Sequence, residues 1–285
     1  MRATSQHYRV GAHEPGGFGL AGLRGTTVSS VSATHGEFGE ADRRTVRIEI
    51  GVMLAVTFGV SAVVAVLRLA DAVLSGLPGY RVRLNPNQSR YDLINLGLNL
   101  VSVGQLVAWG ALALYLLWRS GISPAGIGLG RLRWRADLLG GMGLATLIGI
   151  TGLLFYLAAR TLGMNAEVEP SSLQHSWWRI PVLILAAFAN GFAEEVVVVG
   201  FLITRLRQLG LTQSKAVAIS GALRGVYHLY QGFGAGLGNV VMGLVFGYAW
   251  CRTGRLWPLV IAHGIIDSVA FVGYALLAGH IGWLR

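Results

Sequence analysis

Long apolar runs separated by short basic breaks make up the chain after residue 46. An apolar run of about 20 residues is long enough to cross the hydrocarbon core of a membrane as a helix. We therefore predict an all-α fold, a polytopic transmembrane helix bundle of about seven spans. The predicted spans cover residues 50–77, 93–118, 136–159, 178–203, 216–230, 237–250 and 257–277.

Residues 1–46 differ from the rest, because they are rich in Gly, Ser, Thr and Arg and have no sustained apolar period. Such a composition is typical of disorder, so we predict a disordered cytosolic tail. We divide the remainder into N-terminal transmembrane helices with a basic loop, residues 47–178, and a catalytic core, residues 179–285.

The composition agrees with a membrane protein, since 53% of the residues are hydrophobic and only 13% are charged. The formal net charge is +10, but the basic residues lie in the breaks between apolar runs. Membrane topology and anionic lipid headgroups explain them there, so the lipid bilayer is the expected partner and nucleic acid is not. Cys251 is the only cysteine, which excludes an intramolecular disulfide.

Arginine and lysine counts also predict which loops share a side of the membrane. Residues 43–47, 119–135, 204–215 and 252–255 are strongly basic, whereas the alternate breaks are poorer in positive charge. Because basic loops stay in the cytosol, we predict a cytosolic N-terminus. Arg81, Arg83 and Arg90 are exceptions to this pattern.

Three polar pairs interrupt the predicted spans of the catalytic core. An ionisable residue at the centre of a membrane costs about 2.5–3.5 kcal/mol on insertion scales, so a functional reason is the default hypothesis. We expect the three spans to meet inside the bilayer and to form one hydrolytic site. The pairs are Glu194 with Glu195, Arg224 with His228, and His263 with Asp267.

The spacing of these residues predicts their roles. His263 and Asp267 are four residues apart on one helix face, so the carboxylate can orient the imidazole. Glu194 and Glu195 differ by about 100° around a helix axis, so only one can point at a given reacting atom. We expect the other to bind Arg224 or a backbone group.

Other features of the apolar runs have structural interpretations. Arg68 and Asp71 lie about one helical turn apart, which favours their mutual pairing. The repeats Gly221-xxx-Gly225 and Gly243-xxx-Gly247 favour close helix packing. Aromatic residues at span ends are interpreted as interfacial anchors. These are Tyr227, Tyr230, Trp250 and Trp257.

Residues 180–277 resemble the CPBP intramembrane proteases, the family of CAAX prenyl endopeptidases and bacteriocin-processing enzymes. That family carries Glu-Glu-x-x-x-Arg, Phe-x-x-x-His and His-x-x-x-Asn or Asp on three different transmembrane helices. Glu194-Glu195, His228, and His263 with Asp267 match these positions in the same order. Two positions depart: Val199 replaces the arginine, and Arg224 replaces the phenylalanine. We hypothesise that Arg224 supplies the positive charge missing at Val199.

The resemblance implies an intramembrane endopeptidase of a bacterial cytoplasmic membrane, which cleaves a membrane-anchored peptide or protein by glutamate-activated water. The candidate catalytic residues are Glu194, Glu195, His228, His263 and Asp267. Metal assistance stays open: His228, His263 and Asp267 are the candidate zinc ligands, although no His-Glu-x-x-His motif supports zinc. Two alternatives stay open: an ion- or proton-coupled transporter, and a catalytically inactive immunity or binding member of the same fold.

Overall fold

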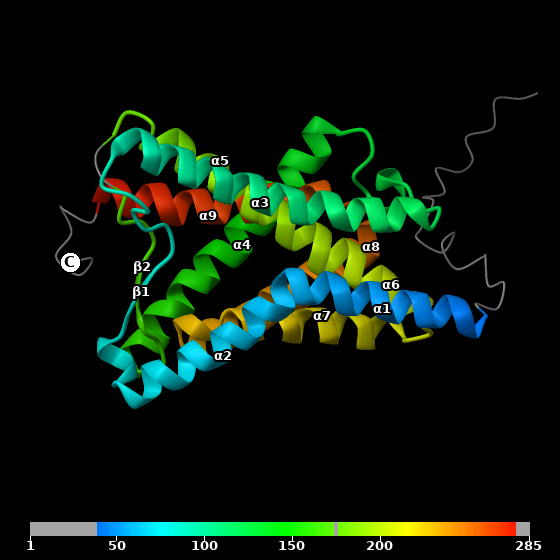
Figure 1. The fold of residues 1–285 in the computed structure, drawn as a ribbon, viewed down its shortest axis with the longest axis horizontal. Helices are drawn as coiled ribbons and strands as arrows, with labels where there is room; N and C mark the ends of the chain where they lie inside the picture. The colour runs from blue at the N-terminus through cyan, green and yellow to red at the C-terminus, as the bar shows by residue number, and fades with distance from the viewer. Residues whose placement is uncertain (1–38, 174–175, 278–285) are drawn as a thin grey trace, which may run out of the picture.

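The computed structural model describes residues 39–173 and 176–277, and these form a bundle of long helices (Figure 1). The predicted tail at residues 1–38 lies outside the described residues. The prediction of an all-α membrane bundle is confirmed. The N-terminal helices are α1 (Glu40–Val56), α2 (Phe58–Leu74), α3 (Asp92–Arg119) and α4 (Trp134–Thr161). The C-terminal ones are α5 (Arg179–Glu194), η4 (Glu195–Phe201), α6 (Leu202–Gln208), α7 (Gln213–Tyr227), η5 (Leu229–Gln231), α8 (Phe233–Thr253) and α9 (Trp257–Leu277).

The first predicted span is a bent pair of helices rather than one straight helix. α1 and α2 meet at Thr57 with a bend of 49°. α1 begins at Glu40, so the last residues of the predicted disordered tail are helical. Glu40 and Asp42 lie in its first turn, where negative charge stabilises a helix through its dipole.

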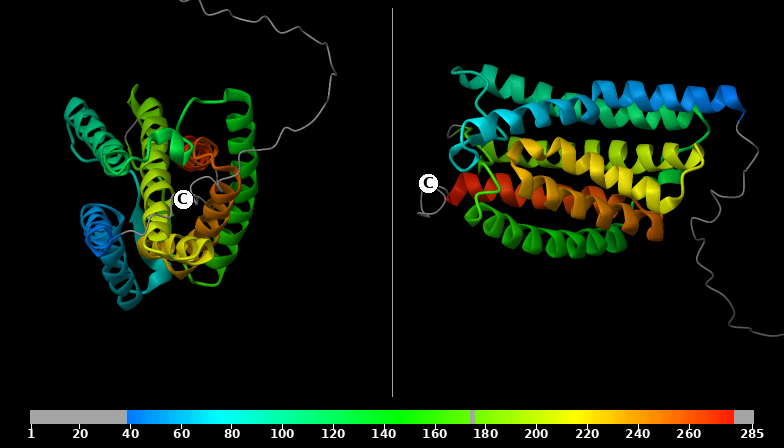
Figure 2. Two further views of the ribbon diagram at one scale, coloured as in Figure 1. Left: turned by 90° about the vertical axis from the view of Figure 1, so that its right-hand side faces the viewer. Right: turned by 90° about the horizontal axis from the view of Figure 1, so that it is seen from below.

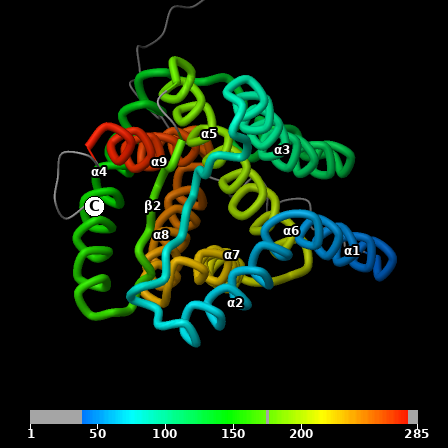
Figure 3. Tube along the Cα trace, turned by 60° about the vertical axis from the view of Figure 1, so that its left-hand side comes forward, coloured from blue at the N-terminus to red at the C-terminus, as the bar shows by residue number. Residues whose placement is uncertain are grey.

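In the described part of the chain, five helices are long and apolar enough to cross a membrane, or six if the bent pair counts as one span. This agrees roughly with the prediction of about seven, and the remaining difference lies in α7. That helix has 15 residues, fewer than a span needs, and packs between α2 and α8. Figure 3 shows α5, α7, α8 and α9 gathered together, with α3 beside α5 and α2 beside α7.

At one end of the bundle the loops that follow α2, α4 and α7 meet. A short strand, β1 (Arg81–Arg83), pairs in parallel with β2 (Glu167–Glu169), and Asn165 bridges to Gly232. Arg81 forms an ion pair with Glu167, and Arg83 with Glu169. Arg81 and Arg83, two of the three exceptions to the charge pattern, are therefore paired with acidic residues of the facing loop.

At the other end the loops predicted to be basic and cytosolic come together. Trp250 donates from its indole nitrogen to the Ile127 carbonyl oxygen at 2.9 Å, and Trp257 donates to that of Gly130 at 2.9 Å. Arg255 forms an ion pair with Asp137. Through these hydrogen bonds the two tryptophans connect α8 and α9 to the loop at residues 119–135. Figure 2 shows the long helices running between these two ends.

Glycines let the helices of the core approach closely, as the sequence predicted. A Cβ atom at Gly225 would lie 2.3 Å from Cγ2 of Val240, and one at Gly243 would lie 2.7 Å from Cα of Gly221. α7 and α8 are therefore held close by contacts that admit no side chain. α5 and α9 approach in the same way at Gly191, directly beside His263.

Candidate active site

The glutamate pair lies at a change of helix type. α5 ends at Glu194, and η4, the segment Glu195–Phe201, is π-helical and completely buried. The span predicted at residues 178–203 is confirmed as part of one long apolar helix, Arg179–Gln208. Nothing in the sequence indicated the π-helical segment within it, because hydrophobic periodicity does not register a change of helical pitch. The Ser220 hydroxyl donates to the Val198 carbonyl oxygen at 2.7 Å, so a side chain of α7 bonds to the backbone of this segment. π-Helical turns inside α-helices are frequent at functional sites.

Glu195 is the centre of a buried ionic cluster. Its Oε1 accepts from Nη2 of Arg224 at 2.6 Å and lies 2.7 Å from Nδ1 of His263. Glu195 and Arg224 have no exposed side-chain surface. The guanidinium of Arg224 also lies over the Phe246 ring, 5.6 Å from its centroid. Arg224 therefore pairs its positive charge with Glu195. This contact is the one hypothesised from the sequence, in which Val199 stands where the family has an arginine.

Glu194 is held by neutral donors. The Tyr227 hydroxyl donates to Oε2 at 2.5 Å, and the Asn190 amide donates to Oε1 at 3.2 Å. The same amide group donates to Oδ2 of Asp267 at 2.9 Å. Arg224 is farther away, with 3.9 Å between Nη2 and Oε2. The two glutamates thus have different partners, and Asn190 joins Glu194 to the last helix.

His263 lies between two carboxylates. Its Nδ1 faces Glu195, while its Nε2 is 3.6 Å from Oδ2 of Asp267. The sequence assigned the orientation of this ring to Asp267 alone. The structure gives the hydrogen bond to Glu195 instead, because Gly191 allows α9 to lie against α5. Asp267 contributes at ion-pair distance and is itself oriented by Asn190.

His228 lies beside this cluster without bonding to its carboxylates. It caps the C-terminus of α7, and its Nδ1 lies 3.0 Å from the Arg224 carbonyl oxygen. Its ring is next to those of Tyr227 and Tyr230, and it interacts electrostatically with Glu194. Among the described residues it makes no hydrogen bond to another predicted site side chain. The structure therefore brings five of the predicted residues into direct contact and places the sixth at their edge.

Two residues of the cluster were not among the sequence candidates. Tyr227 was interpreted as an interfacial anchor, which is wrong, since it is 5% exposed and bonds to Glu194. Asn190 was not singled out, although an amide four residues before Glu194 lies on the same helix face. That spacing was the available signal.

Among the described residues, the side chains of this cluster are not gathered into a set of zinc ligands. Zinc needs about three protein ligands and an open position, and the part of the chain described here contains no such group of His, Cys, Asp and Glu side chains. Nδ1 of His263 faces Glu195 and Nδ1 of His228 faces a backbone carbonyl, so only their Nε2 atoms could bind a metal.

Several polar atoms of the cluster have no hydrogen-bond partner among the described residues. They are Oε2 of Glu195 and the Nε and Nη1 atoms of Arg224, all buried. Unpaired buried polar atoms are rare in folded proteins and point to a role beyond packing. They give the cluster one free acceptor and two free donors for a substrate or water.

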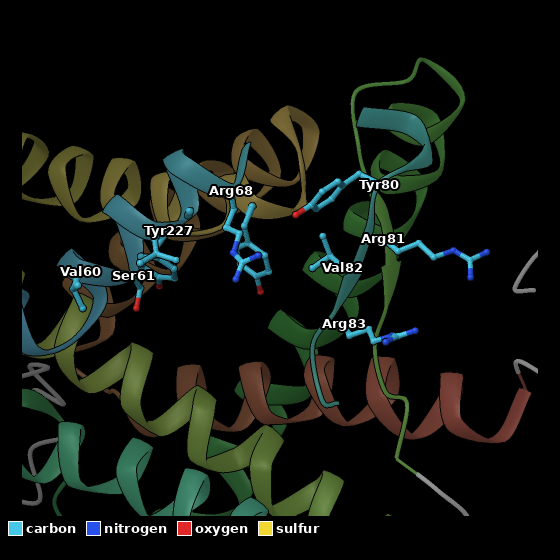
Figure 4. A pocket seen from close by; sticks show the side chains of 11 residues that line it. Val60, Ser61, Arg68, Tyr80, Arg81, Val82, Arg83 and Tyr227 are labelled. Carbon is cyan, nitrogen blue, oxygen red and sulfur yellow. The ribbon is translucent and has the colours of Figure 1, made fainter. Parts of the chain in front are cut away.

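A cavity of about 470 Å³ reaches the cluster at Tyr227. Its other walls come from α2 and β1, and Figure 4 shows Tyr227 facing the same space as Arg68 and Val82. Ligand pockets in proteins are of this size, roughly 300–1,000 Å³. Tyr227 therefore lies between Glu194 and a space large enough for part of a peptide.

The predicted Arg68–Asp71 pair is absent from the described residues. Asp71 accepts a hydrogen bond from the Tyr80 hydroxyl at 2.9 Å instead. Arg68 lines the cavity. The prediction failed because the loop after α2 returns Tyr80 to the helix, which spacing within the helix could not show.

Comparison with known proteins gives a family match over part of the chain. Residues 176–269 match the family model for type II CAAX prenyl endopeptidases, Rce1-like. No curated protein and no solved structure matches the chain. The matched segment contains all of the predicted site residues together with Asn190 and Tyr227. Residues 176–269 thus carry a match to the Rce1-like endopeptidase family, which confirms the predicted resemblance to the CPBP intramembrane proteases.

Proposed function

We propose that this protein hydrolyses a peptide bond of a membrane-anchored peptide or protein inside the bilayer, with Glu194 activating the attacking water. The observation that carries the proposal is the buried cluster of two glutamates, an arginine and a histidine beside a cavity. Buried charges are costly in a membrane protein, and this cluster joins three helices rather than one. The family match supports an intramembrane endopeptidase.

Glu194 suits the role of base better than Glu195. A direct arginine pair stabilises a carboxylate as its anion and weakens it as a proton acceptor. Glu195 has such a pair at 2.6 Å, whereas Glu194 is bonded by a phenol and an amide. Glu194 also lies next to Tyr227, which lines the cavity. We assign to Glu195 the role of holding the His263 ring in place.

The reaction then follows from these positions. Glu194 accepts a proton from water, and the water oxygen attacks the peptide carbonyl carbon. His263, which Glu195 holds through Nδ1, donates from its other ring nitrogen to the oxyanion that develops. The C–N bond breaks, and Glu194 returns its proton to the leaving amine. Asn190 keeps Glu194 and Asp267 in place through one amide group.

The test compares membranes that express the parent chain with membranes that express Glu194→Gln, by proteomics of newly formed protein termini. The glutamine keeps hydrogen-bonding partners for Asn190 and Tyr227 but cannot accept the proton. Loss of a general base typically lowers the rate by about 10²–10⁴-fold, so termini made by the parent should disappear. Glu40→Gln, an exposed acid at the start of α1, serves as the control. Unchanged termini together with measurable ion flux would favour the transporter alternative.

The sequence-based hypothesis of zinc on His228, His263 and Asp267 stays a prediction. Elemental analysis of the purified protein tests it directly. Stoichiometric zinc that is lost together with activity in His263→Ala would replace the metal-free mechanism proposed here.

A further inference from the structure

The hydroxyl group of Tyr227 has no task in the reaction proposed above. Its oxygen lies 2.5 Å from Oε2 of Glu194, and the side chain is buried. The same side chain lines the cavity of about 470 Å³ (Figure 4). Among the described residues that line this cavity, Tyr227 alone bonds to a glutamate of the site. A substrate that reaches Glu194 from the cavity must therefore pass close to this hydroxyl group.

The helix that carries Tyr227 binds both glutamates. Arg224 and Tyr227 are three residues apart on α7, so they share a face, and each bonds to a different carboxylate of the pair. The Tyr227 ring packs against Phe58 and His228, with ring centroids 4.9 and 4.7 Å away. These contacts fix the position of the hydroxyl oxygen. Its hydrogen atom can still rotate about the C–O bond to face a new acceptor.

Other donors of the cluster are engaged or lie away from the cavity. Asn190 gives its amide group to two carboxylates, those of Glu194 and Asp267. Arg224 bonds to Glu195 and does not line the cavity. An ionised carboxylate has no hydrogen to donate. The tyrosine hydroxyl is therefore the donor that faces both the base and the cavity.

From this arrangement we infer that Tyr227 is a further catalytic residue, which donates a hydrogen bond to the oxyanion together with His263. The inference rests on the proposed function. During the attack a water proton moves to Glu194, the water oxygen bonds to the carbonyl carbon, and the carbonyl π electrons move to the carbonyl oxygen. Negative charge leaves the carboxylate as it appears on the oxyanion, so the hydrogen bond of the tyrosine moves with it. The tyrosine O–H bond stays intact throughout.

The experiment separates turnover from binding. A lipid-anchored peptide is made around one cleavage site that the comparison with Glu194→Gln identifies, and the full-length protein cleaves it in nanodiscs. Tyr227→Phe keeps the ring and removes the donor. Loss of one oxyanion donor lowers kcat by about 10²–10³-fold, and KM should stay nearly unchanged because the contact forms only in the transition state. Tyr115→Phe, at an exposed tyrosine outside the cavity, should behave as the parent.

A second measurement distinguishes an oxyanion donor from a residue that only holds Glu194. The same peptide is made with a phosphinate in place of the scissile bond, which supplies a tetrahedral centre and a negative oxygen. Both peptides are titrated in the Glu194→Gln background, where the substrate stays intact and removal of the hydroxyl leaves no unpaired charge. Adding Tyr227→Phe should weaken binding of the phosphinate by about 10²-fold or more and leave binding of the substrate peptide unchanged.

Cleavage by Tyr227→Phe at the parental rate would overturn the inference and leave the proposed function standing. Slower cleavage with unchanged affinity for the phosphinate would also overturn it, and would make Tyr227 a positioning residue for Glu194. Equal loss of affinity for both peptides would assign the tyrosine to substrate binding, against the inference. If no terminus depends on Glu194, the proposed function itself fails, and the role of Tyr227 fails with it.

Discussion

Arg224 and Glu195 illustrate what one buried ion pair does in this protein. Both side chains lack exposed surface, and their nearest nitrogen and oxygen are 2.6 Å apart. The pair holds His263 in place through the same carboxylate oxygen. Removing one partner leaves the other as an unpaired charge in a medium that solvates it poorly.

Arg224→Met should therefore destabilise the protein by about 3–5 kcal/mol, because Glu195 keeps its charge without a partner. The double variant Arg224→Met, Glu195→Gln should recover part of that loss, since the glutamine is neutral. Unfolding of the purified protein in detergent measures both. Arg119→Met, at an exposed pair with Glu49, is the control and should cost about 1 kcal/mol or less. A double variant no more stable than Arg224→Met alone would contradict the coupling.

Asn190 and Tyr227 belong to the site but could not be identified from the sequence one residue at a time. An asparagine and a tyrosine in apolar spans have many structural uses, so residue type alone does not select them. Their significance comes from the atoms they reach on Glu194. By contrast, adjacent glutamates in a valine-rich run are costly enough to identify from sequence.

At the scale of elements, the contact between α5 and α9 positions the reacting groups. A Cβ atom at Gly191 would lie 3.0 Å from the Gly264 nitrogen and 3.0 Å from Cβ of His263. These contacts are too short for an added methyl group unless α9 moves. Any such movement shifts His263 relative to Glu195.

Gly191→Ala should lower the rate of cleavage roughly tenfold, because the added methyl group forces α5 and α9 apart by a few tenths of an ångström and reacting groups tolerate little displacement. The melting temperature should fall much less than the rate. Gly273→Ala is the matched control on α9, since nothing lies within 4 Å of a Cβ atom there. A Gly191→Ala variant that cleaves as fast as the Gly273→Ala variant would show that this helix contact does not set the site.

The π-helical segment Glu195–Phe201 is a second feature that depends on how the helices pack against one another. A run of buried valines has no polar face, so its sequence pattern does not distinguish α- from π-helical pitch. The Ser220 hydroxyl on α7 bonds to the Val198 carbonyl, which only the packed bundle brings within reach.

At the scale of the whole molecule, the loops sort to the two ends as the charge pattern predicted. The loops at residues 119–135 and 252–255 touch each other through Arg255 and the Arg131 carbonyl oxygen, and the loops that carry β1 and β2 meet at the opposite end. The orientation of the bundle in the membrane stays a prediction from the positive-inside rule.

We expect position 120 to face the cytosol and position 161 to face the opposite side. Both are exposed, at the ends of α3 and α4. Ser120→Cys and Thr161→Cys are made in a Cys251→Ser background, which removes the only native thiol. A membrane-impermeant maleimide added to intact cells should label position 161 and not position 120. The reverse labelling would invert the topology and place the cavity beside Tyr227 at the cytosolic end.

The sequence by itself determined the membrane class, most helix positions, the loops that share an end and the charged residues of the site. These features depend on local composition and on the cost of burying charge, and both can be read along the chain. Only the tertiary structure decided that Glu195 takes Arg224 and His263 and that Glu194 takes Asn190 and Tyr227. Those pairings depend on how closely the helices approach one another, and the glycines that permit it act only when two helices meet.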